Sequence, residues 1–161
     1  MDTRGRLLAS RIRSLVLEGV PPNRICVTSP NNFEVEALCG ALSRSGIEIL
    51  PFWKNHHDLS EMDFDAPKVK VMTAWKAKGL TFDTVFIVGF DRLKNPNEAG
   101  LSTLEFEKRH NTAKLCLVAP TRAENRLSIV YSRSNYFLDN LVDRRADLRE
   151  LRWPDDFEGV S

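Results

Sequence analysis

The sequence predicts an α/β domain built on a mostly parallel β-sheet. Five short runs rich in β-branched residues are spaced along the 161 residues, and segments with helical spacing of apolar residues lie between them. The run 84–90 (TVFIVGF) is apolar at nearly every position, which is typical of a strand buried on both faces of a parallel sheet. Alternation of strand and helix favours this architecture, and the length fits one domain spanning 1–161.

The predicted strands share β-branched content and short length. They are 24–29 (RICVTS), 47–50 (IEIL), 69–74 (VKVMTA), 84–90 (TVFIVGF) and 127–132 (LSIVYS).

Four segments between or beyond these runs have an apolar face at helical spacing. The first carries Leu8, Ile12, Leu15 and Val16, the second Val35, Leu38, Cys39 and Leu42, the third Ala113, Cys116, Leu117 and Pro120, and the fourth covers about 134–151 with Phe137, Leu138, Leu141 and Leu148. The second has Asn31 or Asn32 as a candidate N-cap and ends near Gly46.

Two segments do not fit as core elements. Residues 51–67 are acidic and bounded by prolines, and residues 91–101 contain Pro96 and Gly100, so both are predicted to be loops. Ligands of open α/β sheets bind at the carboxyl ends of the strands. We therefore expect functional residues at 29–32, 74–81 and 91–100, and around the last helix-to-strand turn.

Composition excludes several classes of protein. Hydrophobic residues make up 42% and charged residues 28%, as in an average globular protein, and no apolar run is long enough for a membrane span. The first residues have no hydrophobic signal core, so we expect a cytoplasmic protein without a membrane partner. The three cysteines lack C-x-x-C spacing and are interpreted as reduced core thiols.

No metal site is predicted. His56 and His57 with Asp58 and Glu61 are interpreted as a polar loop, because no second cluster of ligands accompanies them. Nor does the chain contain a G-x-x-x-x-G-K-[ST] phosphate loop, or an apolar strand that ends in an Asp-Glu pair for Mg²⁺. The chain therefore cannot form a complete nucleotide hydrolase by itself.

Local charge is uneven although the net charge is only +1. Residues 1–13 carry four arginines against one aspartate, and residues 68–90 carry Lys68, Lys70, Lys76 and Lys78 against Asp83. Such clusters favour contact with anions, but a solvated surface has the same pattern.

The segment 69–89 combines features of a nucleic-acid contact. Gly79 allows the backbone to approach a phosphate, Lys76 and Lys78 supply positive charge, and Trp75 could stack on a base. An ordinary connection between two strands, with surface lysines and a core tryptophan, would have the same residues.

The segment 114–132 places Thr121 and Arg122 at the end of a helix that leads into a strand. Arg122, Arg126 and Arg133 could face an anion across a domain interface. The alternative is that Arg122 only stabilises the helix end through the helix dipole.

Together and in this order, the two segments resemble motifs V and VI of superfamily 1 DNA helicases of the UvrD/Rep/PcrA type. The matching residues are Thr73, Ala77, Lys78, Gly79, Leu80 and Phe82, then Val118, Ala119, Thr121, Arg122 and Ala123. Residues 24–49 also resemble the strand–helix–strand that precedes the large insertion of that family. The insertion would fall within 51–67, where this chain has the acidic loop.

The resemblance implies a RecA-like domain, with helices on both faces of its sheet, that forms the C-terminal half of an ATP-dependent DNA helicase or translocase. Arg122 would be the catalytic arginine finger, and Gly79, Leu80 and Thr81 would lie with it at the nucleotide. Thr73, Trp75, Lys76, Lys78 and Gly79 would contact single-stranded DNA. ATP and Mg²⁺ would bind only together with an N-terminal RecA-like domain, which this chain lacks.

Three residues depart from the family pattern. Trp75 replaces the usual histidine, Thr81 replaces a glutamate expected near the nucleotide sugar, and Pro120 lies where a helix is expected and predicts a kink. These departures keep two alternatives open. One is a diverged, non-catalytic module that binds DNA or another protein, and the other is a flavodoxin-like domain that binds a small anion at 74–81.

Overall fold

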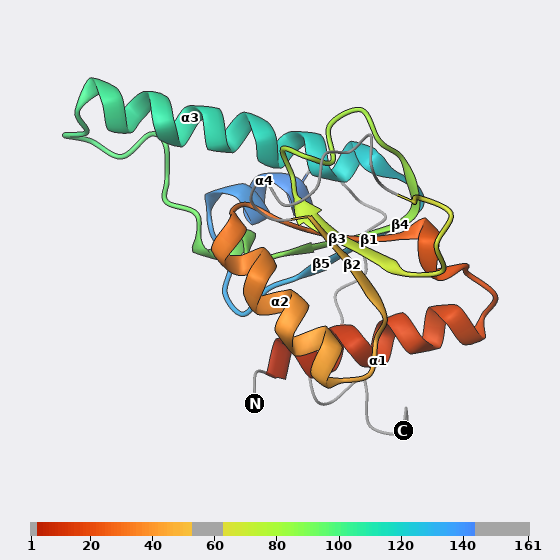
Figure 1. The fold of residues 1–161 in the computed structure, drawn as a ribbon. Coiled ribbons are helices and arrows are strands. Elements are labelled where there is room, and N and C mark those ends of the chain that lie inside the picture. The colour runs from red at the N-terminus through yellow and green to blue at the C-terminus, as the bar shows by residue number, and fades with distance from the viewer. Residues whose placement is uncertain (1–2, 53–62, 144–161) are drawn as a thin grey trace.

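The computed structural model describes residues 3–52 and 63–143. Its five strands form one sheet in the order β2-β3-β1-β4-β5, and all four neighbouring pairs are parallel. Helices cover both faces of the sheet (Figure 1). The predicted α/β fold with a RecA-like arrangement is therefore confirmed.

The elements follow one another as strand–helix units with short 3₁₀ turns. They are α1 (Thr3–Leu17), η1 (Pro22–Arg24), β1 (Ile25–Ser29), α2 (Asn32–Arg44), β2 (Ile49–Phe52), β3 (Val69–Thr73), β4 (Phe82–Val88), η4 (Phe90–Arg92), α3 (Thr103–Val118), η5 (Ala119–Arg122), β5 (Ala123–Val130) and α4 (Tyr136–Asp143).

Two hydrophobic cores lie on opposite faces of the sheet, because successive side chains of a strand point to opposite sides. Val27 and Phe86 pack with the apolar residues of α1 and α2. Cys26 and Val85 pack with residues of α3, η5 and α4, including Leu138. The central strands are consequently buried on both sides, as their continuous apolar runs predicted.

The five predicted strands are confirmed, but β4 and β5 begin earlier than predicted and β2 lies two residues later than its predicted 47–50. β5 begins at Ala123, ahead of the predicted 127–132, and its first residues are polar and largely exposed at the edge of the sheet. No apolar pattern marked them for that reason. The second helix uses Asn31 as its cap, since the side chain of Asn31 accepts a hydrogen bond from the Glu34 backbone N–H at 2.9 Å.

The third helix is longer than its apolar pattern indicated. α3 begins at Thr103, where the Ser102 hydroxyl accepts a hydrogen bond from the Glu105 N–H at 3.2 Å. The first half of α3 projects from the body of the domain (Figure 1), so it lacks the apolar face that would have marked it. The helix ends at Val118, and Pro120 lies in the 3₁₀ turn η5. The predicted kink is therefore a change from α-helix to 3₁₀ geometry.

Two predicted segments lie partly outside the described residues. Pro51 and Phe52 belong to β2 and not to the predicted loop 51–67. Residues 53–62, with the His56–His57 pair, lie outside the described residues, as does the part of the predicted helix 134–151 beyond Asp143.

Lys70 is buried in β3, so it does not add to the surface charge of the basic segment 68–90. The Lys70 ammonium donates hydrogen bonds to the backbone carbonyls of Phe64 at 2.8 Å, Ala66 at 3.2 Å and Lys68 at 3.2 Å. Burial lowers the pKa of this lysine, and the nearby Asp63 carboxylate partly opposes that shift. Its charge stabilises the turn before β3.

Cys26, Cys39 and Cys116 are buried free thiols, as predicted. Burial raises the pKa of Cys39 and of Cys116 to about 12 and shifts that of Cys26 in the same direction. Among the described helices, none is long and apolar enough to cross a membrane.

Candidate nucleotide and nucleic-acid site

Residues 74–81 connect two parallel strands without a helix. Thr73 ends β3 at the carboxyl edge of the sheet and Phe82 begins β4 at the amino edge, so the connection crosses the sheet. Ala77 is buried in the core on the α3 face, and the backbone N–H of Leu80 donates to the Ala77 carbonyl at 3.0 Å. We call residues 74–81 the crossover.

The first part of the crossover lies at the carboxyl edge. The Ala74 N–H donates to the Ser29 carbonyl at 2.9 Å, which fixes the crossover to the end of β1. Thr73 is buried, and its hydroxyl accepts a hydrogen bond from the Lys76 N–H at 3.3 Å. Its side chain therefore shapes the turn and offers little surface to a ligand.

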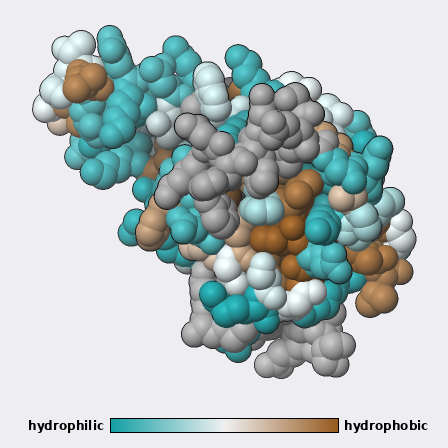
Figure 2. Space-filling model, viewed as in Figure 1, coloured by the Kyte–Doolittle hydropathy of each residue, from teal (hydrophilic) through white to brown (hydrophobic). Residues whose placement is uncertain are grey.

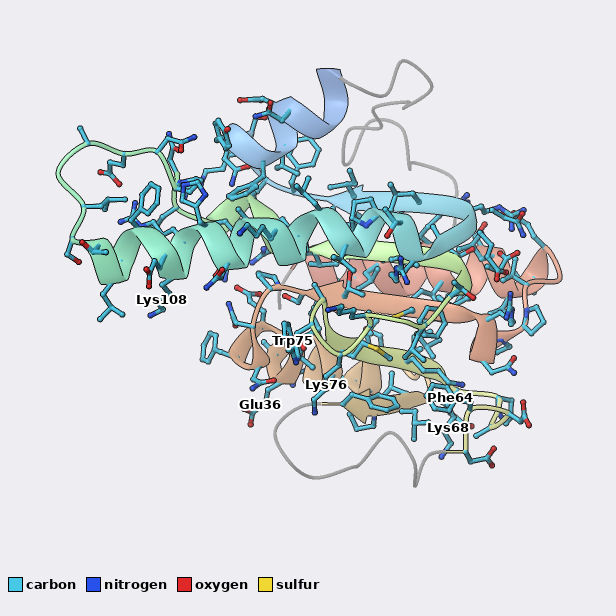
Figure 3. All side chains as sticks on the ribbon, turned by 90° about the horizontal axis from the view of Figure 1, so that it is seen from above. Glu36, Phe64, Lys68, Trp75, Lys76 and Lys108 are labelled. Carbon is cyan, nitrogen blue, oxygen red and sulfur yellow. The ribbon has the colours of Figure 1, made fainter. Side chains whose placement is uncertain are left out.

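Trp75 is a surface residue, contrary to the alternative of a core tryptophan. Its side chain is 62% exposed, and the Lys78 ammonium lies 5.8 Å from the centre of its ring. Figure 3 shows the side chains of Trp75 and Lys76 close together on the crossover. An exposed indole beside positive charge has the chemistry of a platform for a nucleic-acid base.

The second part of the crossover leads to the amino edge, where β4 begins. Gly79 has a φ of +85°, a conformation that favours glycine, and open space surrounds the position where a Cβ would lie. Leu80 packs against the core on the α3 face, so only its backbone can face a ligand. Thr81 is exposed immediately before β4.

Arg122 lies at this same amino edge. Phe82 pairs with Ala123 across β4 and β5, so the residues before them, Thr81 and Arg122, are neighbours. Arg122 donates two hydrogen bonds to the Thr121 hydroxyl oxygen, from Nε at 3.1 Å and from Nη2 at 2.8 Å. Within residues 3–52 and 63–143, no carboxylate lies within ion-pair distance of Arg122.

Arg122, Arg126 and Arg133 do not point at a common site. Arg126 pairs with Asp83 at 3.4 Å and with Glu18 at 3.9 Å, and Arg133 follows β5 at the opposite edge of the sheet. The hypothesis of a shared arginine cluster is therefore wrong, and Arg122 alone remains as a candidate for an anion contact.

The candidate residues thus form two groups at opposite edges of the sheet. Thr73, Trp75 and Lys76 lie at the carboxyl edge, Thr81 and Arg122 lie at the amino edge, and Gly79 and Leu80 belong to the connection between the two. Thr81 and Arg122 lie in the expected segments 74–81 and the last helix-to-strand turn, but at the opposite edge from the carboxyl ends of the strands. Thr81 is there because the crossover carries the chain from one edge to the other within a few residues.

Sequence reasoning missed a polar network at the carboxyl ends of β4 and β5. Asp91 is 2% exposed, and its Oδ2 accepts hydrogen bonds from the Ser132 N–H at 3.1 Å and from the Ser132 hydroxyl at 2.8 Å. Arg4 of α1 lies 4.0 Å from the other carboxylate oxygen. An aspartate directly after the nearly apolar run 84–90 was the available signal.

Comparison with known proteins matches the part of the chain that contains the crossover and Arg122. Residues 47–134, more than half of the chain, match the model of the UvrD-like helicase C-terminal domain. The chain belongs to the UvrD-like helicase C-terminal domain family. Both the crossover and Arg122 lie within the matched residues of this UvrD-like domain, whereas β1 and α2 lie before them.

A solved structure is similar to the UvrD-like domain in fold. The C-terminal domain of a possible DNA helicase from Lactobacillus plantarum superposes with a TM-score of 0.59 at 20% sequence identity, covering 86% of this chain and 73% of that chain. The search of curated proteins found no match.

Proposed function

We propose that this UvrD-like domain is the C-terminal half of an ATP-dependent DNA helicase or translocase. In this proposal it binds single-stranded DNA at the carboxyl edge and contributes Arg122 to an ATP site shared with an N-terminal RecA-like domain. Family membership supports the general assignment. The proposed ATP site depends on one observation, the pairing of Phe82 with Ala123. This pairing brings Thr81 and Arg122 to the same edge of the sheet, and Arg122 has no carboxylate partner among the described residues.

Arg122 suits a phosphoryl-transfer site. Its guanidinium is a planar donor that can bind two phosphate oxygens at once, and charge spreads over those oxygens in the transition state. Bound ATP with Mg²⁺ would supply the reactive γ-phosphoryl group. The phosphate loop and the Mg²⁺ ligands would belong to the N-terminal domain, because the present sequence has neither motif.

The crossover supports the DNA-binding part of the proposal. Trp75 and Lys78 combine an exposed ring with a positive charge, a pairing that suits stacking on a base next to a backbone phosphate. Replacement of a histidine by tryptophan enlarges the ring surface available for stacking.

Thr81 and Pro120 favour a second candidate, a diverged module that binds DNA without ATP chemistry. Thr81 lacks the carboxylate expected near the nucleotide sugar, and Pro120 places Arg122 on a 3₁₀ turn instead of an α-helix.

ATP turnover by the complete helicase, which contains both domains, distinguishes the two candidates. We expect Arg122→Ala to lower kcat by about 10³-fold or more while the domain stays folded. Arg44→Ala is the matched control, because Arg44 is an exposed arginine in the last turn of α2 and is not one of the candidate site residues, so its kcat should stay within a few-fold of wild type.

A kcat of Arg122→Ala within a few-fold of wild type would contradict the proposed ATP site. If that variant also lost about 0.3–1 kcal/mol of stability, Arg122 would be a helix-end charge only.

A further inference from the structure

A basic pocket lies beside the carboxyl edge, between η4, α3 and α4. It has a volume of about 230 Å³, and four of its lining residues are cationic. These are Arg92, Lys94, Lys108 and Arg109. The visible surface of the projecting half of α3 is mostly hydrophilic (Figure 2).

The two arginines of this pocket are neutralised by carboxylates. Arg109 pairs with Glu105 at 2.9 Å and with Glu98 at 2.5 Å, and Arg92 pairs with Glu34 of α2. They therefore hold the pocket walls together and leave little charge for a ligand.

The two lysines differ from the arginines. Lys94 and Lys108 are exposed, and among the described residues neither has a carboxylate within ion-pair distance. Both line the same pocket, Lys94 from the chain between η4 and α3 and Lys108 from α3 itself. The pocket thus presents two ammonium groups that attract an anion.

An exposed aromatic residue lies along the edge between this pocket and Trp75. The strand order places the end of β1 between the ends of β3 and β4. Phe33, in the first turn of α2 after β1, is 77% exposed. Its neighbour Glu34 pairs with Arg92 of the pocket, and the Ser29 carbonyl accepts a hydrogen bond from the crossover.

The strand order therefore places the end of β1, which leads to Phe33, between the ends of β3 and β4, which lead to Trp75 and to the pocket lysines. Figure 3 shows Trp75, Lys76 and Lys108 toward the same side of the molecule. Alternation of exposed rings and positive charge is the pattern that binds single-stranded nucleic acid without reading its sequence.

We propose that the single-strand track extends beyond the crossover, with Phe33 stacking on a base and Lys94 and Lys108 binding a backbone phosphate in the pocket. This inference rests on the proposed binding of single-stranded DNA at Trp75. It adds one aromatic and one phosphate subsite outside the two helicase motifs.

The test titrates chain 1–161 with fluorescein-labelled oligothymidylate of about 16 nucleotides over a series of salt concentrations. The double variant K94Q/K108Q removes the two ammonium groups proposed to bind phosphate. It should weaken binding and reduce the slope of log affinity against log salt by about 0.7 for each phosphate that is no longer neutralised.

Two further variants separate stacking from general charge. Phe33→Ala should weaken binding about 5-fold or more without changing the salt slope, because it removes no charge. Lys114→Gln removes an exposed lysine of the same helix that does not line the pocket, so its affinity and slope should match wild type. Circular dichroism of each variant confirms folding.

The outcomes separate this inference from the proposed function. If Trp75→Ala weakens binding while K94Q/K108Q and Phe33→Ala leave it unchanged, the extended track is wrong and binding at the crossover stands. An equal loss in Lys114→Gln and in K94Q/K108Q would also overturn the pocket. Wild-type chain that fails to bind the oligonucleotide at low salt overturns both, whatever Arg122 contributes to ATP turnover.

Discussion

Phe82 and Ala123 face each other across the β4–β5 ladder. This pair joins the end of the crossover to the end of η5, two segments that are far apart in the sequence. The position of Arg122 relative to Thr81 therefore depends on the register of two parallel strands. Interactions that hold this register act on the proposed ATP site from outside it.

The Asp83 carboxylate forms one set of these interactions, and its ionisation predicts that the stability of the domain depends on pH. Its carboxylate accepts hydrogen bonds from the Asn125 side chain at 2.5 Å and from Arg126 at 3.4 Å. The Asn125 hydrogen bond is the main cause of a lowered Asp83 pKa, with further contributions from Thr84, Arg126 and Arg24. The Asp83 contribution to stability is therefore complete above its unfolded pKa of about 3.9 and disappears as pH falls through the lower folded value.

Asp83→Asn should remove this part of the acid destabilisation. Urea unfolding of both proteins from pH 5 downward measures it, and the difference in unfolding free energy should shrink below pH 4. A difference that stays constant across this range would contradict the assignment.

Thr121 positions Arg122 and is expected to affect turnover through it. The Thr121 hydroxyl accepts both hydrogen bonds from the guanidinium and donates to the Val118 carbonyl at 2.8 Å. Thr121→Val should lower kcat of the complete helicase about 10-fold, a loss of about 1.4 kcal/mol of transition-state stabilisation. Thr121→Ser keeps the hydroxyl and should restore most of kcat, whereas equal rates in Thr121→Val and wild type would show that the contact is incidental.

Trp75 and Lys78 should contribute to DNA binding in different ways. Trp75→Ala removes a stacking surface worth about 1–3 kcal/mol and should raise the Kd for single-stranded DNA about 5- to 150-fold. Trp75→Phe should retain part of that affinity. Lys78→Gln should instead weaken binding to all sequences and flatten the salt dependence. Fluorescence anisotropy measures all three, and unchanged affinity throughout would identify the crossover as a structural connection only.

Lys70 should be important for stability and unimportant for DNA binding. Lys70→Met leaves the carbonyls of Phe64, Ala66 and Lys68 without their shared donor, and we expect a loss of about 2–4 kcal/mol. Thermal and urea unfolding measure this loss, with Lys68→Met as the control, because its side chain donates no such bonds among the described residues. DNA affinity of folded Lys70→Met should equal that of wild type. Reduced affinity would instead show that Lys70 contributes to DNA binding.

The sequence predicted the elements that bury apolar side chains and missed those that do not. The runs that became β1, β3 and β4 were visible because both faces are buried. The first halves of α3 and of β5 were missed because they are largely exposed to solvent, so their sequences show no periodic pattern of apolar residues. Asn31 was a candidate cap from its type alone, but only the structure distinguishes it from Asn32.

The sequence predicted which residues belong to the candidate site, but it did not predict how they are arranged in space. Trp75, Gly79 and Arg122 were chosen by residue type and motif, which are properties of the chain. The division into two edges was missed, because it follows from a helix-free crossover that spacing does not reveal. Phe33 and Lys108 were missed as well, since their relation to Trp75 arises from strand order.

The three backbone carbonyls that accept hydrogen bonds from Lys70 also determine how much the sequence and length of the chain before β3 can vary. Residues 63–68 are tied to the buried ammonium from within, so the entry into β3 is fixed locally. An insertion between Phe52 and Asp63 should therefore leave the register of β3 on β1 unchanged, because the hydrogen bonds from Lys70 to the turn before β3 all go to residues after that point.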